Sequence, residues 1–468
     1  MQIKLSFLGG AHSVTGSRYL LEAGSTKVLV DCGMCQEREC RERDWLPFPV
    51  PPNEIDAVLL THAHLDHTGF LPRLVKQGFR GRVYCTGATA DITEVILLDA
   101  GKLQEEDAEF KKRRHEREGK APKYPEIPLY TQEDARDVFP LFTPVKLREK
   151  VKISDTIEAV FYNAGHVLGS ANIKVTAGTG EYRRTVLFSG DIGTAGRPII
   201  RDPAEGLEAD YVLVESTYGD RTIVPNEDVE TQLAEVIVAT EQAGGNIVIP
   251  SFALERSQDI LYYINKLQME NRIPHLMVFL DSPMAVSITE IFEKYPQLFD
   301  AEMTELVNNH HSPFRFPNLK LVRTPEESKT INHIKGTAII IAGSGMCNGG
   351  RVKHHLVANI TRKQSTILFV GYQAVATLGR SIVDGAKRVR ILGQEYPVNA
   401  KIVQMLGFSA HADREHLLEW LTGLKKPPRR VFVVHGEIEA ATSFAELVRE
   451  KTGWNVTVPA FLETVVLE

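Results

Sequence analysis

The chain has 468 residues, of which 43% are hydrophobic and 24% charged, as in ordinary soluble globular proteins of two or three domains. No apolar run approaches the roughly 20 residues of a membrane-spanning helix, and five cysteines argue against a disulfide framework. The net charge of −6 excludes a protein that attracts nucleic acid through overall positive charge. Attraction to any polyanion must then come from local basic groups or bound metal.

The chain opens on strand-like sequence, without the basic start and long apolar region of a signal peptide. Cys32, Cys35 and Cys40 lie close together, but no fourth ligand follows at a zinc-like spacing, so we interpret them as free thiols. These features predict a cytoplasmic protein without a membrane partner.

The first 200 residues alternate short β-rich runs with glycine-marked turns. Helical patterns follow Gly69 and cover about 88–112. The β-rich runs lie at 3–10, 18–24, 26–33, 57–63, 82–87, 156–165, 171–178 and 184–191. Turn residues at this spacing predict sheets built largely from hairpins, with helices packed outside.

From about residue 209 the pattern changes to apolar, β-branched strands separated by helical stretches. The strands are expected at 209–216, 246–253, 276–283, 337–346 and 365–373. This alternation predicts a parallel sheet covered on both faces. After about residue 395 come a strand-like run, a helix, a second strand-like run, and a last helix and strand.

The stretch LLTHAHLDHTG, residues 59–69, places four good metal ligands after an apolar strand. His62 and His64 are two apart on extended backbone, so their side chains leave on the same side. Asp66 and His67 follow where the chain turns into a helix and can serve a second, adjacent position. The pattern predicts two metal subsites about 3.5–4 Å apart, as in two-metal hydrolysis, and its ligands suit zinc.

Further ligands are expected at strand ends downstream. His166 lies in a glycine-flanked turn, and Asp191 ends a strand between glycines, where a carboxylate can bridge two ions. Each would be an ordinary turn residue by itself, but after the histidine motif both are predicted ligands. Asp31 also closes an apolar strand. We predict that it accepts a proton from a ligand histidine and fixes its tautomer, with a turn cap as the alternative.

Asp31, the HAHLDH motif, His166 and Asp191 together resemble the ordered motifs of the metallo-β-lactamase superfamily. Later segments resemble its β-CASP branch, whose members process nucleic acids: LVESTYGD, PSFALERSQDIL, LDSPMA, AGSGMCNGGR, GYQAVATLGR, GFSAHAD and FVVHGE. The resemblance covers essentially the whole chain. It implies an α/β fold, a four-layer αβ/βα sandwich at 1–207 completed by 396–468, with an inserted β-CASP α/β cap at 208–395.

The resemblance also implies the metal ligands and the reaction. The ligands would be His62, His64 and His166 for one Zn²⁺, Asp66, His67 and His435 for the second, and Asp191 between the two. Water activated by the two ions would attack a phosphodiester, and Asp66 also belongs to the implied catalytic group.

Other residues are implied to act on the substrate. His411 is the implied general acid for the leaving oxygen, and Glu215 would orient it and raise its pKa. Ser409 is an implied hydrogen-bond donor to the scissile phosphate, with a helix N-cap or turn role equally open. Three arginines in or near cap motifs would bind phosphates, with an ordinary surface role equally open: Arg256, Arg351 and Arg380.

His435 favours RNA over DNA, because RNA-processing members of the branch have histidine at this motif where DNA-repair members usually have an aliphatic residue. The AGSGMCNGG segment is more similar to the group of mRNA 3′-end cleavage factors and their bacterial and archaeal relatives than to the RNase J group. We therefore expect a zinc-dependent ribonuclease acting on single-stranded RNA in processing or degradation, and a homodimer.

Other functions stay open. A DNA nuclease would have the same fold, and a non-catalytic scaffold of an RNA-processing complex would have lost ligands, whereas this chain keeps all seven. Hydrolysis of lactams or thioesters is disfavoured by the cap. The sequence does not decide between internal and stepwise 5′ cleavage, the natural transcript, or whether Mn²⁺ replaces Zn²⁺.

Overall fold

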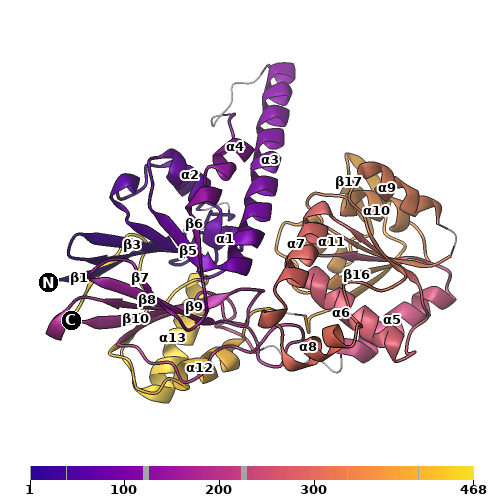
Figure 1. Ribbon diagram of the computed structural model, residues 1–468. Helices are drawn as coiled ribbons and strands as arrows, with labels where there is room; N and C mark the ends of the chain where they lie inside the picture. Colours follow the sequence, from indigo (N-terminus) through magenta and orange to yellow (C-terminus); the bar gives the residue numbers. More distant parts are fainter. Residues whose placement is uncertain (1, 38–39, 120–125, 223–228, 335, 409) are drawn as a thin grey trace. The chain divides into compact units, whose positions relative to one another are not determined.

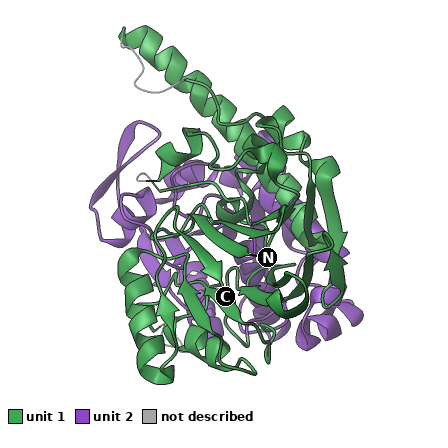
Figure 2. Ribbon diagram, turned by 90° about the vertical axis from the view of Figure 1, so that its left-hand side faces the viewer, with its two compact units in different colours: residues 1–196, 202–222, 411–468 green, residues 197–201, 223–410 purple. Residues whose placement is uncertain are grey.

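The computed structural model describes residues 2–37, 40–119, 126–222, 229–334, 336–408 and 410–468 (Figure 1). The chain divides into two compact units, shown in different colours in Figure 2. Unit 1 comprises residues 1–196, 202–222 and 411–468, and unit 2 comprises residues 197–201 and 223–410.

Within the described residues, unit 1 contains two sheets of seven strands each. The first has the order β22 (Thr464–Leu467), β1 (Ile3–Gly9), β2 (Arg18–Ala23), β3 (Thr26–Val30), β4 (Ala57–Leu59), β5 (Arg82–Thr86) and β6 (Phe142–Val145). The second has the order β21 (Val456–Thr457), β20 (Arg430–Val433), β11 (Tyr211–Val214), β10 (Arg184–Phe188), β9 (Ala171–Ala177), β8 (Ile157–Asn163) and β7 (Lys150–Lys152).

The two sheets pack face to face. Alternate side chains of a strand point to opposite faces, so each sheet has one face toward the other sheet and one toward helices. Leu5, Val28, Phe188 and Phe432 lie in a buried cluster shared by both sheets. Their neighbours point the other way, as Leu29 does toward the helices that cover the first sheet. Each buried leucine or phenylalanine contributes about 1.5–3 kcal/mol to stability.

Helices cover the outer face of each sheet of unit 1. The first sheet packs against α2 (Leu71–Lys76), α3 (Gly87–Glu118) and α4 (Gln132–Arg136), with the short α1 (Leu65–Thr68) ahead of them. The second packs against α12 (Arg414–Thr422) and α13 (Ile438–Thr452). The result is helix, sheet, sheet and helix, so the predicted four-layer αβ/βα sandwich is confirmed.

Unit 2 is built on a parallel sheet of six strands, counted among its described residues. Their order is β14 (Leu319–Leu321), β13 (Met277–Asp281), β15 (Ala338–Ala342), β12 (Ile247–Pro250), β16 (Thr366–Val370) and β19 (Lys401–Met405). β17 (Arg388–Ile391) and β18 (Gln394–Pro397) form a separate hairpin. The predicted parallel α/β cap is confirmed.

The helices of unit 2 connect these strands. They are α5 (Val229–Gln242), α6 (Arg256–Met269), α7 (Pro283–Lys294), α8 (Ala301–Asn308), α9 (Pro325–Thr330), α10 (Val352–Asn359) and α11 (Leu378–Val383). Single 3₁₀ turns of the chain lie at Arg41–Trp45, Pro52–Glu54, Phe139–Leu141, Gly180–Tyr182, Pro296–Leu298 and Ile331–His333.

The unit boundaries differ from the predicted domain boundaries at 207/208 and 395/396. Strand β11 pairs with β10 and β20, so the chain stays in unit 1 beyond residue 208. Strand β19 pairs with β16, so the chain stays in unit 2 beyond residue 396. The predicted domain boundaries remain a proposal.

Candidate metal centre

The candidate ligands gather at the carboxyl ends of strands in unit 1. Strands β3 and β4 run parallel in the first sheet, and β10, β11 and β20 run parallel in the second. Parallel strands end at the same edge of a sheet, which is where α/β proteins bind ligands. The residues at these ends are Asp31 after β3, His62–His67 after β4, Asp191 after β10, Glu215 after β11 and His435 after β20. His166 joins them from the turn between β8 and β9.

Close backbone packing holds the loop that carries His62–His67. The N–H groups of Ser17 and Cys32 donate to the carbonyl oxygens of Asp66 and His67, at 2.9 and 2.8 Å. A Cβ atom at Gly33 would come within 1.6 Å of the Asp66 carbonyl oxygen. Only glycine allows so close an approach, so the glycine fixes the position of the loop.

Two of the candidate residues have left-handed backbone conformations, with φ of 58° at Asp31 and 49° at His435. Such conformations are uncommon outside glycine and persist where surrounding structure compensates for the strain. Here the Asp31 N–H donates to the Leu59 carbonyl at 2.8 Å, and the His435 N–H to the Gly10 carbonyl at 2.7 Å.

The first group of ligands has four members. His62, His64, His166 and Asp191 each offer one atom, and these atoms lie within 4.8 Å of one another. His64 Nδ1 lies 3.0 Å from His62 Nε2 and 3.2 Å from His166 Nε2. Asp191 Oδ2 lies 3.4 Å from His62 Nε2 and 3.5 Å from His166 Nε2. All except His64 are buried.

The second group consists of Asp66, His67 and His435, whose ligand atoms also lie within 4.8 Å of one another. The other carboxylate oxygen of Asp191, Oδ1, lies 3.3 Å from His67 Nε2 and 3.4 Å from His435 Nε2. His435 Nε2 lies 3.9 Å from Asp66 Oδ2. Asp191 therefore presents one oxygen to each group, as a bridging ligand does.

This donor set fits divalent metal ions. Ligand atoms at about 2.0–2.1 Å from a tetrahedral zinc lie roughly 3.3 Å apart. The nitrogens of His67 and His435 lie at 3.3 and 3.4 Å from Asp191, close to that value. His67 Nε2 and Asp191 Oδ1 are also buried without a hydrogen bond, which protein interiors rarely leave uncompensated.

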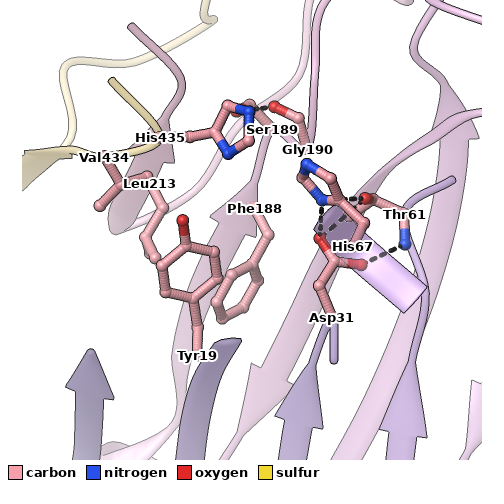
Figure 3. A pocket seen from close by; sticks show the side chains of 10 residues that line it. All are labelled: Tyr19, Asp31, Thr61, His67, Phe188, Ser189, Gly190, Leu213, Val434 and His435. Carbon is pink, nitrogen blue, oxygen red and sulfur yellow. Dashed lines mark hydrogen bonds and ion pairs between the residues drawn. The ribbon is translucent and has the colours of Figure 1, made fainter. Parts of the chain in front are cut away.

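Asp31 lies behind His67, in the position predicted for a residue that fixes the histidine tautomer. Its Oδ2 atom accepts from His67 Nδ1 at 2.7 Å, which leaves Nε2 toward the metal position (Figure 3). The N–H and hydroxyl groups of Thr61 both donate to Asp31, each at 2.8 Å. Asp31 is thereby held rigidly against the ring.

Two supporting residues were missed by the sequence analysis. Ser17 Oγ lies 2.8 Å from His435 Nδ1, and Thr61 Oγ1 lies 3.1 Å from His62 Nδ1. Thr61 directly precedes the histidine motif, and that position could have signalled it. Ser17 gives no local signal, because 418 positions separate it from His435.

A pocket lies behind His67 and His435. Figure 3 shows the two imidazoles on one side and the rings of Tyr19 and Phe188 on the other. Its lining consists of Tyr19, Asp31, Thr61, His67, Phe188, Ser189, Gly190, Leu213, Val434 and His435. The aromatic and aliphatic side chains behind the rings keep the local dielectric low, which strengthens electrostatic interactions at the site.

The electrostatics of the site follow from burial and crowding. Burial lowers the pKa of His62 well below its usual value and that of His64 to about 4. Burial also opposes charge on His67 and Asp191. The Asp191 and Asp31 carboxylates nevertheless raise the pKa of His67, and the histidines hold the pKa of Asp191 well below its usual range. A metal ion must displace the proton that His67 carries.

His411 and Glu215 form a pair beside the two groups. His411 Nδ1 lies 3.5 Å from Glu215 Oε1 and 3.8 Å from Asp191 Oδ2. Glu215 is buried and accepts from the Ile192 N–H at 2.7 Å. Burial lowers the pKa of His411, but the carboxylates of Glu215, Asp191 and Asp66 outweigh it and raise the pKa to about 9. The nearby carboxylates therefore favour the protonated form of His411.

The structure places the predicted phosphate-binding arginines in unit 2. Arg351 donates to Asp281 Oδ1 at 2.6 Å, and Arg256 to the Val370 carbonyl at 2.8 Å. Arg380 pairs with Asp384 at 2.8 Å on the surface. Ser409 lies outside the described residues. The assignment of the three arginines and of Ser409 to RNA binding stays a prediction.

An αβ/βα sandwich with histidine and carboxylate ligands at one sheet edge defines a metal-dependent hydrolase. Three family models match the chain in order: the metallo-beta-lactamase superfamily at residues 14–241, the Beta-Casp domain at 257–382 and the Zn-dependent metallo-hydrolase RNA specificity domain at 395–459. The chain belongs to the β-CASP branch of the metallo-β-lactamase superfamily. The predicted family is confirmed.

Curated relatives match over nearly the whole chain. Ribonuclease TTHA0252 of Thermus thermophilus is 38% identical over 457 residues, which cover 98% of both chains. Transcription termination factor FttA of Methanocaldococcus jannaschii is 32% identical over 99% of this chain and 71% of its own length. An RNase J-like protein of the same organism is 30% identical over 95% and 94%.

A solved structure supports the fold alone. A protein of unknown function from Enterococcus faecalis V583 aligns over 100% of both chains with a TM-score of 0.54 and 12% identity. Separately, none of the helices in the described part of the chain has the length and hydropathy that a bilayer span requires.

Proposed function

We propose that this chain is a zinc-dependent ribonuclease that hydrolyses phosphodiester bonds of single-stranded RNA, with two Zn²⁺ ions per chain. The observation that carries the proposal is the convergence of seven side chains into two groups that share Asp191. The full-length match to a protein named ribonuclease supports RNA cleavage. The match to the termination factor covers less of that protein, 71% of its length, so it supports the family more than the function.

The chain's own residues would divide the work as follows. His62, His64 and His166 would hold one ion, Asp66, His67 and His435 the other, and Asp191 would contact both. When bound, such ions supply Lewis acidity and make water a stronger nucleophile at neutral pH.

His411 would complete the reaction by giving its proton to the leaving oxygen. Despite burial, the Glu215 carboxylate raises the pKa of His411 and so favours the protonated ring that a general acid needs. Glu215 Oε1, 3.5 Å from His411 Nδ1, would stabilise the protonated ring and fix its direction, so that the other ring nitrogen faces the leaving oxygen.

The decisive experiment combines metal analysis with cleavage of three forms of one RNA. The purified chain is expected to contain about two zinc ions and to cut 5′-labelled, 3′-labelled and circular RNA at rates that report its mode. Cleavage of the circle shows internal cutting, whereas mononucleotides released only from the 5′ end show stepwise cutting. A chain with less than one zinc, no gain on adding zinc and no cleavage would instead be a scaffold.

Matched DNA and RNA oligonucleotides address the second class of substrate. We expect the RNA to be cut faster, and faster cleavage of DNA would make this chain a DNA nuclease of the same fold. A repeat after replacing Zn²⁺ with Mn²⁺ identifies the working metal.

We also propose a homodimer that acts in the cytoplasm. Sedimentation of the purified chain would reveal the oligomer. The concentrations should lie above and below about 1 µM, a dissociation constant typical of weak dimers. A single species with the mass of one chain, 52.2 kDa, at all concentrations would contradict the dimer.

A further inference from the structure

A row of half-exposed apolar side chains lies at one edge of the sheet of unit 2. Phe252 and Tyr372 follow the carboxyl ends of β12 and β16 by two residues, and Leu406 follows the end of β19 by one. The three strands are neighbours in the sheet, and β16 and β19 stay paired as far as Val370 and Met405, so Tyr372 and Leu406 follow adjacent strand ends. The exposed fractions are 49% for Phe252, 45% for Tyr372 and 49% for Leu406.

The backbone around this row is closely packed. A Cβ atom at Gly345 would lie 3.0 Å from two ring atoms of Phe252, so the ring rests on bare backbone. The side-chain amide of Gln373 donates to the Gly345 carbonyl at 3.2 Å, and that of Gln404 to the Gly371 carbonyl at 3.0 Å. The aromatic rings therefore stand on loops that are already fixed.

Positive charge lies in the same row. The guanidinium of Arg256 donates to the Val370 carbonyl at 2.8 Å, and a Cβ atom at Gly371 would lie 3.1 Å from it. Arg256 thus sits between the ends of β12 and β16, next to the residue that precedes Tyr372. Arg380, in α11, pairs with Asp384 on the surface and also contacts the Tyr372 side chain, so a second cation lies beside that ring.

Half-exposed apolar side chains at the ends of neighbouring strands are a candidate binding surface. The carboxyl ends of parallel strands are the usual ligand-binding edge of an α/β sheet. Aromatic rings interleaved with arginine match the chemistry of single-stranded nucleic acid, in which bases stack on rings and phosphates meet cations.

We propose that Phe252, Tyr372 and Leu406, with Arg256, form a stacking surface for the bases of single-stranded RNA. This proposal rests on the proposed function. It adds which residues would bind the RNA bases and why single-stranded RNA would be preferred over duplex RNA. Stacking needs the open face of a base, which a duplex hides. The surface would therefore favour single strands of any sequence over duplex RNA.

The experiment measures binding of a 5′-fluorescein-labelled oligoadenylate to the full chain by anisotropy, in a His411→Ala background that slows cleavage enough for the anisotropy to be read. Phe252→Ala and Tyr372→Ala are each expected to weaken binding roughly five- to a hundredfold, which is the usual cost of losing one stacked base. Phe252→Trp and Tyr372→Phe keep a ring and should restore binding. Met269→Ala removes a comparably exposed side chain, 44%, elsewhere in unit 2 and should change nothing.

Abasic substrates separate stacking from a general structural effect. Removing one base at a time from the oligomer should weaken binding to the wild-type surface at one or two positions. At those positions Phe252→Ala or Tyr372→Ala should show no further loss, because the stacking partner is already missing.

The stacking surface is overturned by unchanged affinity in both alanine variants, or by equal abasic losses in wild type and variants. A change of oligomeric state without a change in RNA affinity would reassign the row to a protein contact and overturn it as well. A wild-type chain that neither binds nor cuts RNA contradicts the proposed function itself. RNA cleavage with unaffected variants contradicts only the stacking surface.

Discussion

Asp191 in unit 1 and Asp281 in unit 2 are both buried at strand ends beside histidines. They differ in whether hydrogen-bond donors of the chain satisfy their carboxylate oxygens. Asp281 accepts from Arg351 on one oxygen at 2.6 Å. Its other oxygen accepts from His355 at 2.6 Å and Ser328 at 2.5 Å. Both oxygens of this carboxylate are satisfied by hydrogen-bond donors of the chain itself.

Asp191 is surrounded by histidines that also face one another. Its Oδ1 atom has no hydrogen bond, and His67 Nε2 next to it has none either. The difference shows that burial and composition do not distinguish a structural charge cluster from a metal site. The distinguishing feature is whether ligand atoms remain directed at a common point after the internal hydrogen bonds are counted.

The largest effect is expected from Asp191→Asn, which keeps the shape of the side chain and removes the charge shared by both groups. Each group would lose its common anionic ligand. We expect RNA cleavage to fall at least about 1,000-fold, because metal ions contribute several kcal/mol to such reactions. Elemental analysis should show less than the wild-type metal content, while thermal unfolding should show a folded chain. Near-normal activity with full metal content would show that Asp191, like Asp281, is not a metal ligand.

His411→Ala tests the group that acts beside the metals. General acids contribute about 10²–10⁴-fold to rate, so cleavage should fall by that range with the metal content unchanged. A substrate whose leaving group is a thiolate needs no proton, and on it the variant should lose far less activity. An equal loss on both substrates would exclude the role of proton donor.

Asp281→Asn should affect stability instead of metal content. Removing one member of a buried ionic cluster typically costs about 3 kcal/mol, which urea unfolding can measure. Ser328→Ala is the milder control and should cost about 1 kcal/mol, because it removes a single hydroxyl donor. Loss of metal from Asp281→Asn would mean that the two clusters are not functionally separate.

The stability difference at Asp281 should also depend on pH. Burial raises the pKa of Asp281, but hydrogen bonds from His355, Ser328 and Arg351 outweigh it and hold the pKa below its usual value. A lowered pKa means that the folded state favours the ionised form. Its contribution is therefore complete above about pH 4 and is lost as the pH falls further, so wild type and Asp281→Asn should converge in acid.

The smallest effect is expected from Ser17→Ala. Ser17 accepts from His435 when Nδ1 carries the proton, and its loss would leave that N–H buried without a partner. Supporting contacts of this kind are worth about 10–100-fold in metal affinity, which competition with a zinc chelator measures. Ser328→Ala is the matched control, because it also removes a single hydroxyl donor but at the Asp281 cluster of unit 2. Equal metal affinity in wild type and Ser17→Ala would remove Ser17 from the site.

The sequence predicted the strands, the helices and the family because their signals are local. Alternating apolar residues in β1 and β10, and the βαβ pattern of unit 2, reflect the faces that each strand buries. The motif at His62–His67 also carries its own geometry, since extended backbone puts His62 and His64 on one side. These parts required no knowledge of how distant segments meet.

Other features depend on contacts that no local pattern encodes. Ser17 meets His435, and Asp31 meets His67, only because strands far apart in sequence end at one edge. The extent of each unit depends on the pairing of β11 and β19, which apolar strand sequence does not reveal. The role of Arg351 was open in the sequence, and its contacts with Asp281 exist only in the folded unit.

The amino-acid sequence by itself determined the chemical inventory: which strands are buried, and which histidines and carboxylates end them. Tertiary structure alone decided that Asp191 faces two groups with its two oxygens while Asp281 turns both of its oxygens to donors of its own unit. The physical reason is that ligand convergence within a few ångströms is a property of strand ends brought together, and sequence distance carries no record of it.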